Sequence, residues 1–198
     1  MKTKHLFWIV PLAIIIILFF SLFSFNNSAV RKLEAVKTSL SNVESSYQRR
    51  ADVITGLVNT VKGAANFEKE VLTEVVEARA KAGQTNINLN DLSASSINQF
   101  ADAQQALSGA LSRLLVTVER YPELKATQNF LEFQSQLEGT ENRINVERNR
   151  YNQAVNTYNT HIKVFPNAIY ADWLGFSEEF QRFQSSEGSQ DAPEISFD

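Results

Sequence analysis

The sequence contains no cysteine, and only two histidines, His5 and His161, are present. The lack of cysteine excludes disulfide bonds, thiolate metal sites and cysteine nucleophiles, and it leaves the redox compartment open. A di-iron bundle needs paired Glu-x-x-His motifs and a zinc hydrolase needs clustered ligands, and the sequence has neither. We therefore expect no metal site and no cofactor.

Proline and glycine are also scarce, with four and seven residues among 198. Long uninterrupted helices are therefore possible, because these two residues are the strongest helix breakers. Without the first 25 residues, the chain keeps 17 basic and 22 acidic residues. This acidic balance argues against nucleic acid as a partner, because phosphate contacts require a basic face.

Recognisable enzyme motifs are missing as well. We find no P-loop, no G-x-G-x-x-G fingerprint and no G-x-S-x-G nucleophile elbow in the sequence. The sequence therefore predicts that the protein is not an enzyme.

What is present begins with an uncharged run of 20 residues from Leu6 to Phe25. At helical rise this run is roughly 30 Å long, which matches the hydrocarbon core of a bilayer. A cleaved signal peptide is the alternative, but its apolar part is usually about 7–15 residues long and ends in a small-x-small site. We therefore expect residues 6–25 to be an uncleaved transmembrane anchor that contacts membrane lipid.

The orientation of this anchor follows from the charges around it. Lys2 and Lys4 precede the span, whereas Arg31, Lys32 and Lys37 follow it, so the positive-inside rule gives nearly a tie. The short basic N-terminus, residues 1–5, is typical of a signal anchor. We expect a single-pass protein of a bacterial inner or cytoplasmic membrane, with its main domain on the extracytoplasmic side.

Beyond the span, apolar residues recur every seven positions from Leu33 onward, which predicts one long helix with a coiled-coil-like seam ending at Gly83. The two series are Leu33, Leu40, Tyr47, Ile54, Val61, Glu68, Val75 and Val36, Val43, Arg50, Leu57, Ala64, Val71, Ala78. Residues 26–48 would form a helical stalk before the bundle, with no evident partner within the chain. Its exposed seam, Leu33, Val36, Leu40 and Val43, is the candidate contact for self-association or for a protein partner.

Further helices are predicted after a polar loop at residues 84–90, with Asn90 or Asp91 as the cap of the next helix. That helix buries one face and ends at Pro122, which also suits the first turn of a third helix. The third helix runs to Pro166, and a short fourth helix covers residues 171–183. The buried series are Phe100, Leu107, Leu111, Leu114, Val118, Tyr121 and Phe130, Leu137, Ile144, Tyr151, Tyr158, Phe165.

The predicted fold is therefore all-α: an antiparallel three- to four-helix bundle with long coiled-coil-like helices, preceded by one N-terminal transmembrane helix. The bundle would cover residues 49–183, and a disordered acidic tail would cover residues 184–198.

Short motifs within the bundle carry a resemblance to a known family. Gln48–Ile54 reads QRRADVI and is similar to the QRRADLI segment of the LemA family. Other blocks follow in the family's order and with similar spacing: Leu57–Gly63, Phe67–Leu72, Glu77–Arg79, Leu114–Val116, Glu119–Lys125, Asn129–Phe130, Leu137–Ile144, Arg148–Asn152 and Tyr158–Pro166. Thr55 departs from the pattern, because the family usually has proline there, and we expect a straighter first helix than in relatives.

This resemblance implies a membrane-anchored helical bundle of poorly defined biochemical role and no catalytic residue. A magnetosome-building member of the family suggests a role in membrane organisation.

Polar clusters offer candidate sites for structural pairing or partner binding: Arg49, Arg50, Asp52, Glu119, Arg120, Glu141 and Arg148. An anion or partner site is the functional interpretation, and ion pairs that fix helix register are the structural one. Antiparallel pairing of the first two helices, with residue numbers summing to about 173, would place Tyr121 beside Asp52. The two polar clusters would then meet at the membrane-facing end of the bundle.

Two functional hypotheses remain. The first is a non-enzymatic scaffold that presents a helical surface to a protein partner near the membrane. The second is an extracytoplasmic domain that senses a small-molecule ligand of unknown class. With five residues before the span, we expect such a sensor to signal through a membrane partner.

Overall fold

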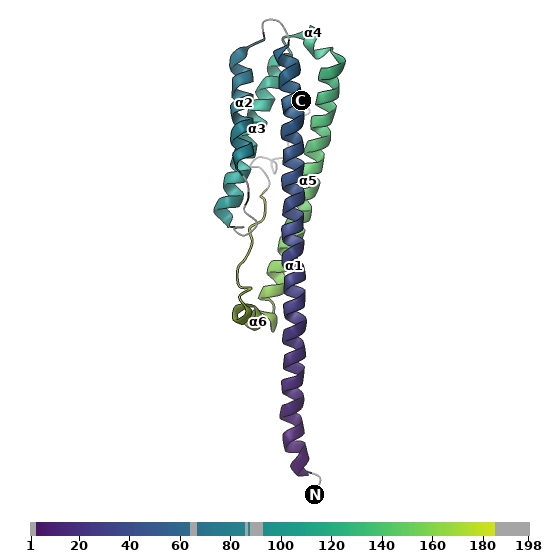
Figure 1. The fold of residues 1–198 in the computed structure, drawn as a ribbon, viewed down its shortest axis with the longest axis vertical. Helices are drawn as coiled ribbons and strands as arrows, with labels where there is room; N and C mark the ends of the chain where they lie inside the picture. Colours follow the sequence, from purple (N-terminus) through teal and green to yellow (C-terminus); the bar gives the residue numbers. More distant parts are fainter. Residues whose placement is uncertain (1–2, 64–66, 86, 88–92, 185–198) are drawn as a thin grey trace, which may run out of the picture.

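The computed structural model describes residues 3–63, 67–85, 87 and 93–184. Six helices are described: α1 (Thr3–Lys62), α2 (Lys69–Gln84), α3 (Ala94–Val118), α4 (Pro122–Lys125), α5 (Gln128–Lys163) and α6 (Asn167–Leu174). The described residues contain no strand. The predicted all-α bundle with one N-terminal apolar helix is therefore confirmed, and Figure 1 shows its elongated shape.

Helix α1 is 60 residues long and continues without a break from the apolar N-terminal run into the bundle. Among the described residues it is the helix that is long and apolar enough to cross a membrane, which makes it a candidate membrane anchor. Large apolar side chains of its first part, such as Trp8, Ile17 and Phe20, are exposed. Further along, the same helix lines the core from Phe25 to Val61. One element thus serves as both the candidate span and the centre of the bundle.

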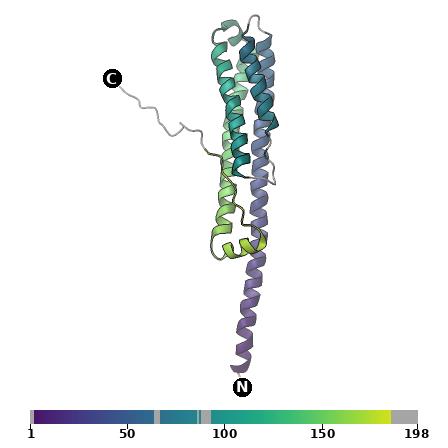
Figure 2. The ribbon, with the colours of Figure 1, turned by 90° about the vertical axis from the view of Figure 1, so that its left-hand side faces the viewer.

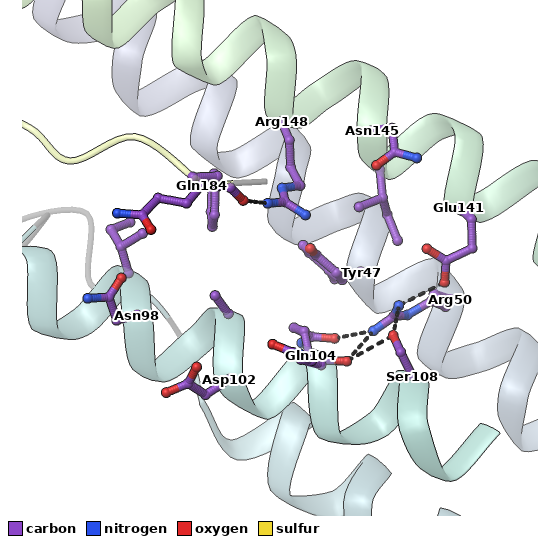
Figure 3. A pocket seen from close by; sticks show the side chains of 15 residues that line it. Tyr47, Arg50, Asn98, Asp102, Gln104, Ser108, Glu141, Asn145, Arg148 and Gln184 are labelled. Atoms are coloured by element: carbon purple, nitrogen blue, oxygen red, sulfur yellow. Dashed lines mark hydrogen bonds and ion pairs between the residues drawn. The ribbon is translucent and has the colours of Figure 1, made fainter. Parts of the chain in front are cut away.

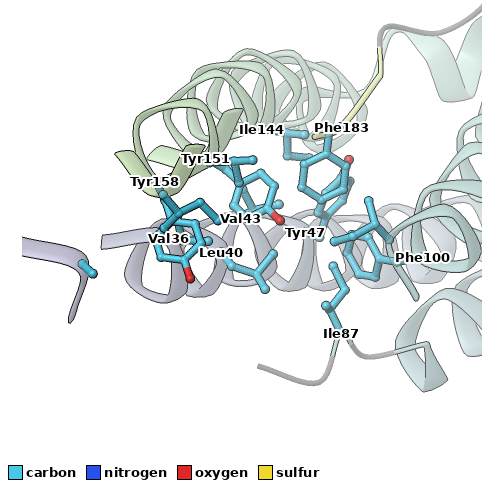
Figure 4. Packing of buried hydrophobic residues seen from close by; sticks show 14 of the residues in the cluster. Val36, Leu40, Val43, Tyr47, Ile87, Phe100, Ile144, Tyr151, Tyr158 and Phe183 are labelled. Carbon is cyan, nitrogen blue, oxygen red and sulfur yellow. The ribbon is translucent and has the colours of Figure 1, made fainter. Parts of the chain in front are cut away.

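Antiparallel packing of α1 against α5 forms the first hydrophobic cluster (Figures 1 and 4). Val36, Leu40 and Val43 of α1 have no exposed surface, and Tyr151, Val155 and Tyr158 of α5 belong to the same cluster. The prediction of an exposed stalk seam is therefore wrong. The seven-residue pattern correctly marks a buried face, but the face is covered by the chain's own α5 because that helix extends far enough to reach it.

A second cluster fills the end of the bundle that lies away from the apolar span. Its members come from α1 to α5 and include Ile54, Leu57, Val75, Leu107 and Leu114. There α2 and α3 form an antiparallel hairpin in which Arg113 pairs with Glu74, and Arg120 pairs with Glu68 at 2.8 Å.

The first predicted helix is wrong in one respect, because it is two helices. α1 ends at Lys62 and α2 begins at Lys69. Gly63, whose amide bonds back to Thr60 O at 3.3 Å, follows directly, and glycine is a poor helix former. Beyond the break, the Phe67 ring packs on the Tyr121 ring with centroids 4.9 Å apart. The break therefore turns the chain back so that α2 can pair with α3.

The predicted register of the first two helices is also wrong. Tyr121 lies beside Phe67, not Asp52, and the turn at Tyr121 lies at the end of the bundle away from the span (Figure 1). The reason is that the chain reverses after Lys62, so α2 runs back toward the span and α3 returns to the end where α1 stops (Figure 1). The other end of α3 extends past α2. Phe100, near its start, packs against Tyr47 of α1 with ring centroids 5.0 Å apart.

Several helix ends differ from the prediction because side chains cap them. Ser93 caps α3 by accepting a bond from the Ser96 amide, so the cap is neither Asn90 nor Asp91, which lie outside the described residues. Pro122 begins only the four-residue α4, and Thr127 caps α5 by accepting a bond from the Phe130 amide. α5 ends at Lys163, so Phe165 lies beyond the helix, and its side chain is 82% exposed instead of buried as predicted.

The fourth helix lies earlier than predicted, at α6, and ends at Gly175, which adopts a left-handed conformation with φ of 79°. Residues 176–184, which we name the strap, then run non-helically back along the bundle (Figure 2). Asn159 and Asn152 hold the strap, because each side-chain amide both donates to and accepts from the backbone of one strap residue, Phe180 and Phe183 respectively. The predicted disordered tail lies outside the described residues, apart from Gln184.

Candidate functional site: a polar pocket around Arg50

Arg50 lies on the seam of α1, and its side chain is 3% exposed. One terminal nitrogen donates to Glu141 Oε1 of α5 at 2.8 Å and to Ser108 Oγ of α3 at 3.1 Å. The other donates to the side-chain and backbone oxygens of Gln104 at 2.7 and 3.3 Å. The guanidinium carbon also lies 5.0 Å from the centre of the Tyr47 ring. A single side chain therefore joins three helices (Figure 3).

Local sequence explains why polar groups meet here. Arg50 occupies a seam position where its heptad neighbours are apolar, and Gln104 lies on the same stripe of α3 as Phe100 and Leu107. A buried arginine is tolerated only where partners satisfy its donors. Gln104 and Glu141 supply those partners, although Arg50 Nε is buried without a hydrogen-bond partner among the described residues.

Beside this network is a pocket of about 600 Å³ between α1, α3, α5 and the strap. Its lining is mostly polar and includes Asn98, Asp102, Asn145 and Arg148 (Figure 3). The Arg148 guanidinium donates to Gln184 O and lies 5.3 Å from the centre of the Phe183 ring, so the strap fixes its position. The pocket can therefore offer hydrogen-bond donors and acceptors to a polar molecule.

The hydroxyl groups of Ser108 and Tyr47 contribute to the chemistry of the pocket. Ser108 accepts a bond from Arg50 and donates to Gln104 O at 3.1 Å, so no base activates its hydroxyl. Burial raises the pKa of Tyr47, although Arg148 and Arg50 oppose this rise, so the phenol stays protonated at physiological pH. In the part of the chain that the structure describes, no group of three metal-ligating side chains is found.

The structure divides the residues that the sequence analysis grouped together. Arg50, Glu141 and Arg148 meet at the pocket. Arg49 and Asp52 lie on the exposed face of α1. Glu119 and Arg120 lie at the far end of the bundle, paired with Lys125 at 2.5 Å and with Glu68. The predicted junction between the two clusters is therefore wrong, because the hairpin register places them at different heights.

Sequence reasoning missed Gln104, Ser108 and the two strap-binding asparagines. A polar residue within the apolar stripe of α3 was the available signal for Gln104. For the strap, the signal was a repeated pair, Tyr151-Asn152 and Tyr158-Asn159, spaced seven residues apart. In each pair the tyrosine packs on a strap phenylalanine and the asparagine binds its backbone.

Comparison with known proteins gives a family match over most of the bundle. A model of the LemA family matches residues 39–197. Protein LemA of Metamycoplasma hominis is 26% identical over 139 residues, which cover 70% of this chain and 60% of the relative.

Two further similarities are to magnetosome proteins. Magnetosome protein MamQ 2 of Paramagnetospirillum magneticum is 29% identical over 176 residues, covering 78% of this chain and 64% of the relative. Magnetosome protein MamQ of Magnetospirillum gryphiswaldense is 25% identical over 177 residues, covering 80% and 63%. The chain thus matches less than two thirds of the length of these curated relatives.

Proposed function

The chain belongs to the LemA family, and from that premise and the geometry of α1 we propose that it is a membrane-anchored interaction protein that catalyses no reaction. In this proposal the apolar part of α1 crosses a bacterial membrane once. The bundle stands outside the cytoplasm and presents its surface to a protein partner. Similarity to magnetosome proteins supports a role in membrane organisation.

The observation that carries the proposal is the continuity of α1. The helix runs from Thr3 to Lys62 without a break and packs into both hydrophobic clusters. From Phe25 to Lys62 it extends roughly 55 Å at a rise of about 1.5 Å per residue. A bundle built on such a helix is held at a fixed height above the membrane, which suits a scaffold.

Photo-crosslinking in intact cells tests whether the bundle binds a partner. A photoreactive residue is placed at exposed Glu123, at the far end of the bundle, or at exposed Asn145, on the pocket rim. The matched control is Ile54, which has no exposed surface. We expect a discrete protein adduct from a surface position and none from Ile54. If both surface positions give no adduct in cells that contain the folded protein, the interaction proposal is wrong.

The proposed orientation requires a separate test. Protease added to spheroplasts should degrade the bundle, because the short basic N-terminus favours a cytoplasmic start. Full protection of the bundle, with digestion in lysed cells as the control, would place it inside the cytoplasm.

The polar pocket supports a second candidate function, which is ligand sensing through a membrane partner. Arg148, Asn98 and Asn145 line a volume of about 600 Å³, large enough for a small polar molecule. Native mass spectrometry of the detergent-extracted full chain should then show a bound small molecule that is lost in Arg148→Ala. A chain that carries no small molecule in either form would argue against this second function.

A further inference from the structure

Large apolar side chains are concentrated at the corner between α5 and α6. Phe165 is 82% exposed, Trp173 74% and Ile169 62%, and Val164 and Leu174 are also exposed. We name these five residues the α5–α6 corner. Elsewhere in the described bundle, the exposed large apolar residues occur singly along the sequence: Val30, Val76, Val116, Leu131 and Val146. Single exposed apolar residues are ordinary, but a contiguous group marks a contact surface.

Within α6, the apolar residues lie on two different faces. Ile169 and Trp173 are four residues apart and therefore share the exposed face. Tyr170 and Ala171 face the bundle and belong to the first hydrophobic cluster or pack against it. The short helix is thus fastened by one side and leaves the other side uncovered.

The height of this corner is set by contacts with α1. Phe25 is the last residue of the predicted span, residues 6–25, and its ring is buried. Its centroid lies 5.2 Å from that of His161 and 5.7 Å from that of Tyr170. Figures 1 and 2 show α6 at the end of the bundle from which α1 extends alone. The corner therefore lies at the level where the apolar span ends.

We propose that the α5–α6 corner inserts into the headgroup region of the bilayer that α1 spans and forms a second membrane contact of the same chain. This inference rests on the proposed anchoring of α1. Lipid is the occupant that the geometry favours, because the corner adjoins the surface that the span itself enters. Tryptophan and other aromatic residues are favoured at this interface, and short amphipathic helices lie within it.

The polar neighbours of the corner are compatible with this position. Lys163 pairs with Glu179 at 2.6 Å, and both side chains are more than half exposed. Asp172 of α6 is exposed, and Arg31 and Lys32 follow the span on α1. These groups can remain in water or contact headgroups while the apolar side chains enter the bilayer. With two contacts, the bundle would be fixed in tilt and rotation as well as in height.

The two tryptophans of the chain, Trp8 and Trp173, make a direct test possible. The full chain with Trp8→Phe keeps Trp173 as its single fluorophore, and Trp173→Phe keeps Trp8. Each variant is placed in phosphatidylcholine nanodiscs with or without nitroxide-labelled lipids, and circular dichroism checks that it is folded. A third chain carries Trp8→Phe, Trp173→Phe and Val116→Trp as the control, because Val116 is 70% exposed in α3, far from the span.

We expect nitroxide near the headgroup to quench Trp173, nitroxide at the acyl-chain end to quench it less, and aqueous iodide to quench it weakly. The tryptophan at position 116 should respond only to iodide. Full iodide access of Trp173 without lipid quenching, while Trp8 is quenched by lipid, would overturn this inference alone. Protection of Trp173 from both quenchers would indicate a protein cover and also overturn it. Absence of lipid quenching at Trp8 would instead overturn the proposed anchoring.

Discussion

At the scale of single residues, Arg50 is the side chain on which three helices depend. Its buried guanidinium makes four hydrogen bonds, and its charge is balanced by Glu141, which is 44% exposed. Removing Arg50 would leave the buried Gln104 side chain without its partner and would open a void where three helices meet, and both effects are destabilising, whereas half-exposed Glu141 loses less.

We predict that Arg50→Ala lowers the free energy of unfolding by about 3 kcal/mol. The neighbouring exposed Arg49 provides the matched control, and Arg49→Ala should change stability by no more than about 0.5 kcal/mol. Urea denaturation of the full chain in detergent, followed by circular dichroism, measures both. Equal stability of the two variants would show that the network does not hold the helices together.

His161 should give stability a dependence on pH. Burial and the nearby charge of Lys32 lower its pKa below the ordinary value. Just below pH 6.5, the unfolded chain therefore binds more protons than the folded chain. The free energy of unfolding is highest above about pH 6.5, and it falls as the pH drops through the pKa of His161 in the folded chain. In His161→Gln, the decrease in melting temperature between neutral and mildly acidic pH should be smaller. An unchanged decrease would show that His161 titrates normally in the folded state.

At the scale of elements, the strap shows how side chains can supply the hydrogen bonds that a non-helical backbone segment would otherwise lack. Asn152 and Asn159 bind the backbone of Phe183 and Phe180, and Tyr151 Oη donates to Gln181 O at 3.0 Å. Non-helical backbone packed on a helix needs such partners, because buried amides and carbonyls are costly to leave unpaired.

We predict that Asn152→Ala combined with Asn159→Ala releases the strap without unfolding the bundle. Hydrogen exchange of the Phe180 and Phe183 amides should become faster, because each loses its acceptor, while α3 amides keep their protection. Exposed Asn156 lies on the same helix, and Asn156→Ala should leave strap protection unchanged. If the double variant protects the strap as well as the native chain does, the asparagines are not what holds it.

The seam of α1 provides a second test at this scale. Leu40 has no exposed surface, whereas Leu131 is 48% exposed. We predict that Leu40→Ala lowers the free energy of unfolding by about 3 kcal/mol, and that Leu131→Ala has a much smaller effect. Denaturation of both variants at low protein concentration measures this. If Leu40→Ala leaves the free energy of unfolding of the monomer unchanged but weakens association between chains, the seam contacts a second chain instead of α5.

These elements also show what the sequence could predict. Seven-residue spacing identified buried positions such as Leu40, Ile54 and Tyr151, because a buried helix face must be apolar at that period. It did not identify the partner of each face, since α5 and a second chain would require the same pattern. The break after Lys62 and the strap depend on contacts with Tyr121 and with two asparagines, which periodicity does not reveal. For the pocket, Arg50 and Glu141 were visible as polar seam residues, but their meeting depends on the register between α1 and α5, which seven-residue spacing does not determine.

At the scale of the whole molecule, the proposed function depends on how α1 joins the bundle to the proposed span. If α1 is one rigid helix from the proposed span to the far end of the bundle, the proposed partner-binding surface has a fixed height above the membrane. If the helix bends near residues 26–28, the bundle is only tethered. The two cases differ in how the span and the bundle are coupled, because a rigid helix fixes the position of the bundle relative to the span and a flexible joint does not.

Spin labelling measures this difference most directly, and the absence of native cysteine lets two labels be placed without other changes. Phe23→Cys places one label in the proposed span, and Asn59→Cys places the other near the C-terminal end of α1. Both positions are exposed. In nanodiscs, pulsed dipolar spectroscopy of the doubly labelled full chain should give a single narrow distribution of distances between the two labels. Its centre should lie at about 54 Å, the length of 36 residues at helical rise. A broad distribution, or one centred at a much shorter distance, would contradict a continuous helix from the membrane into the bundle.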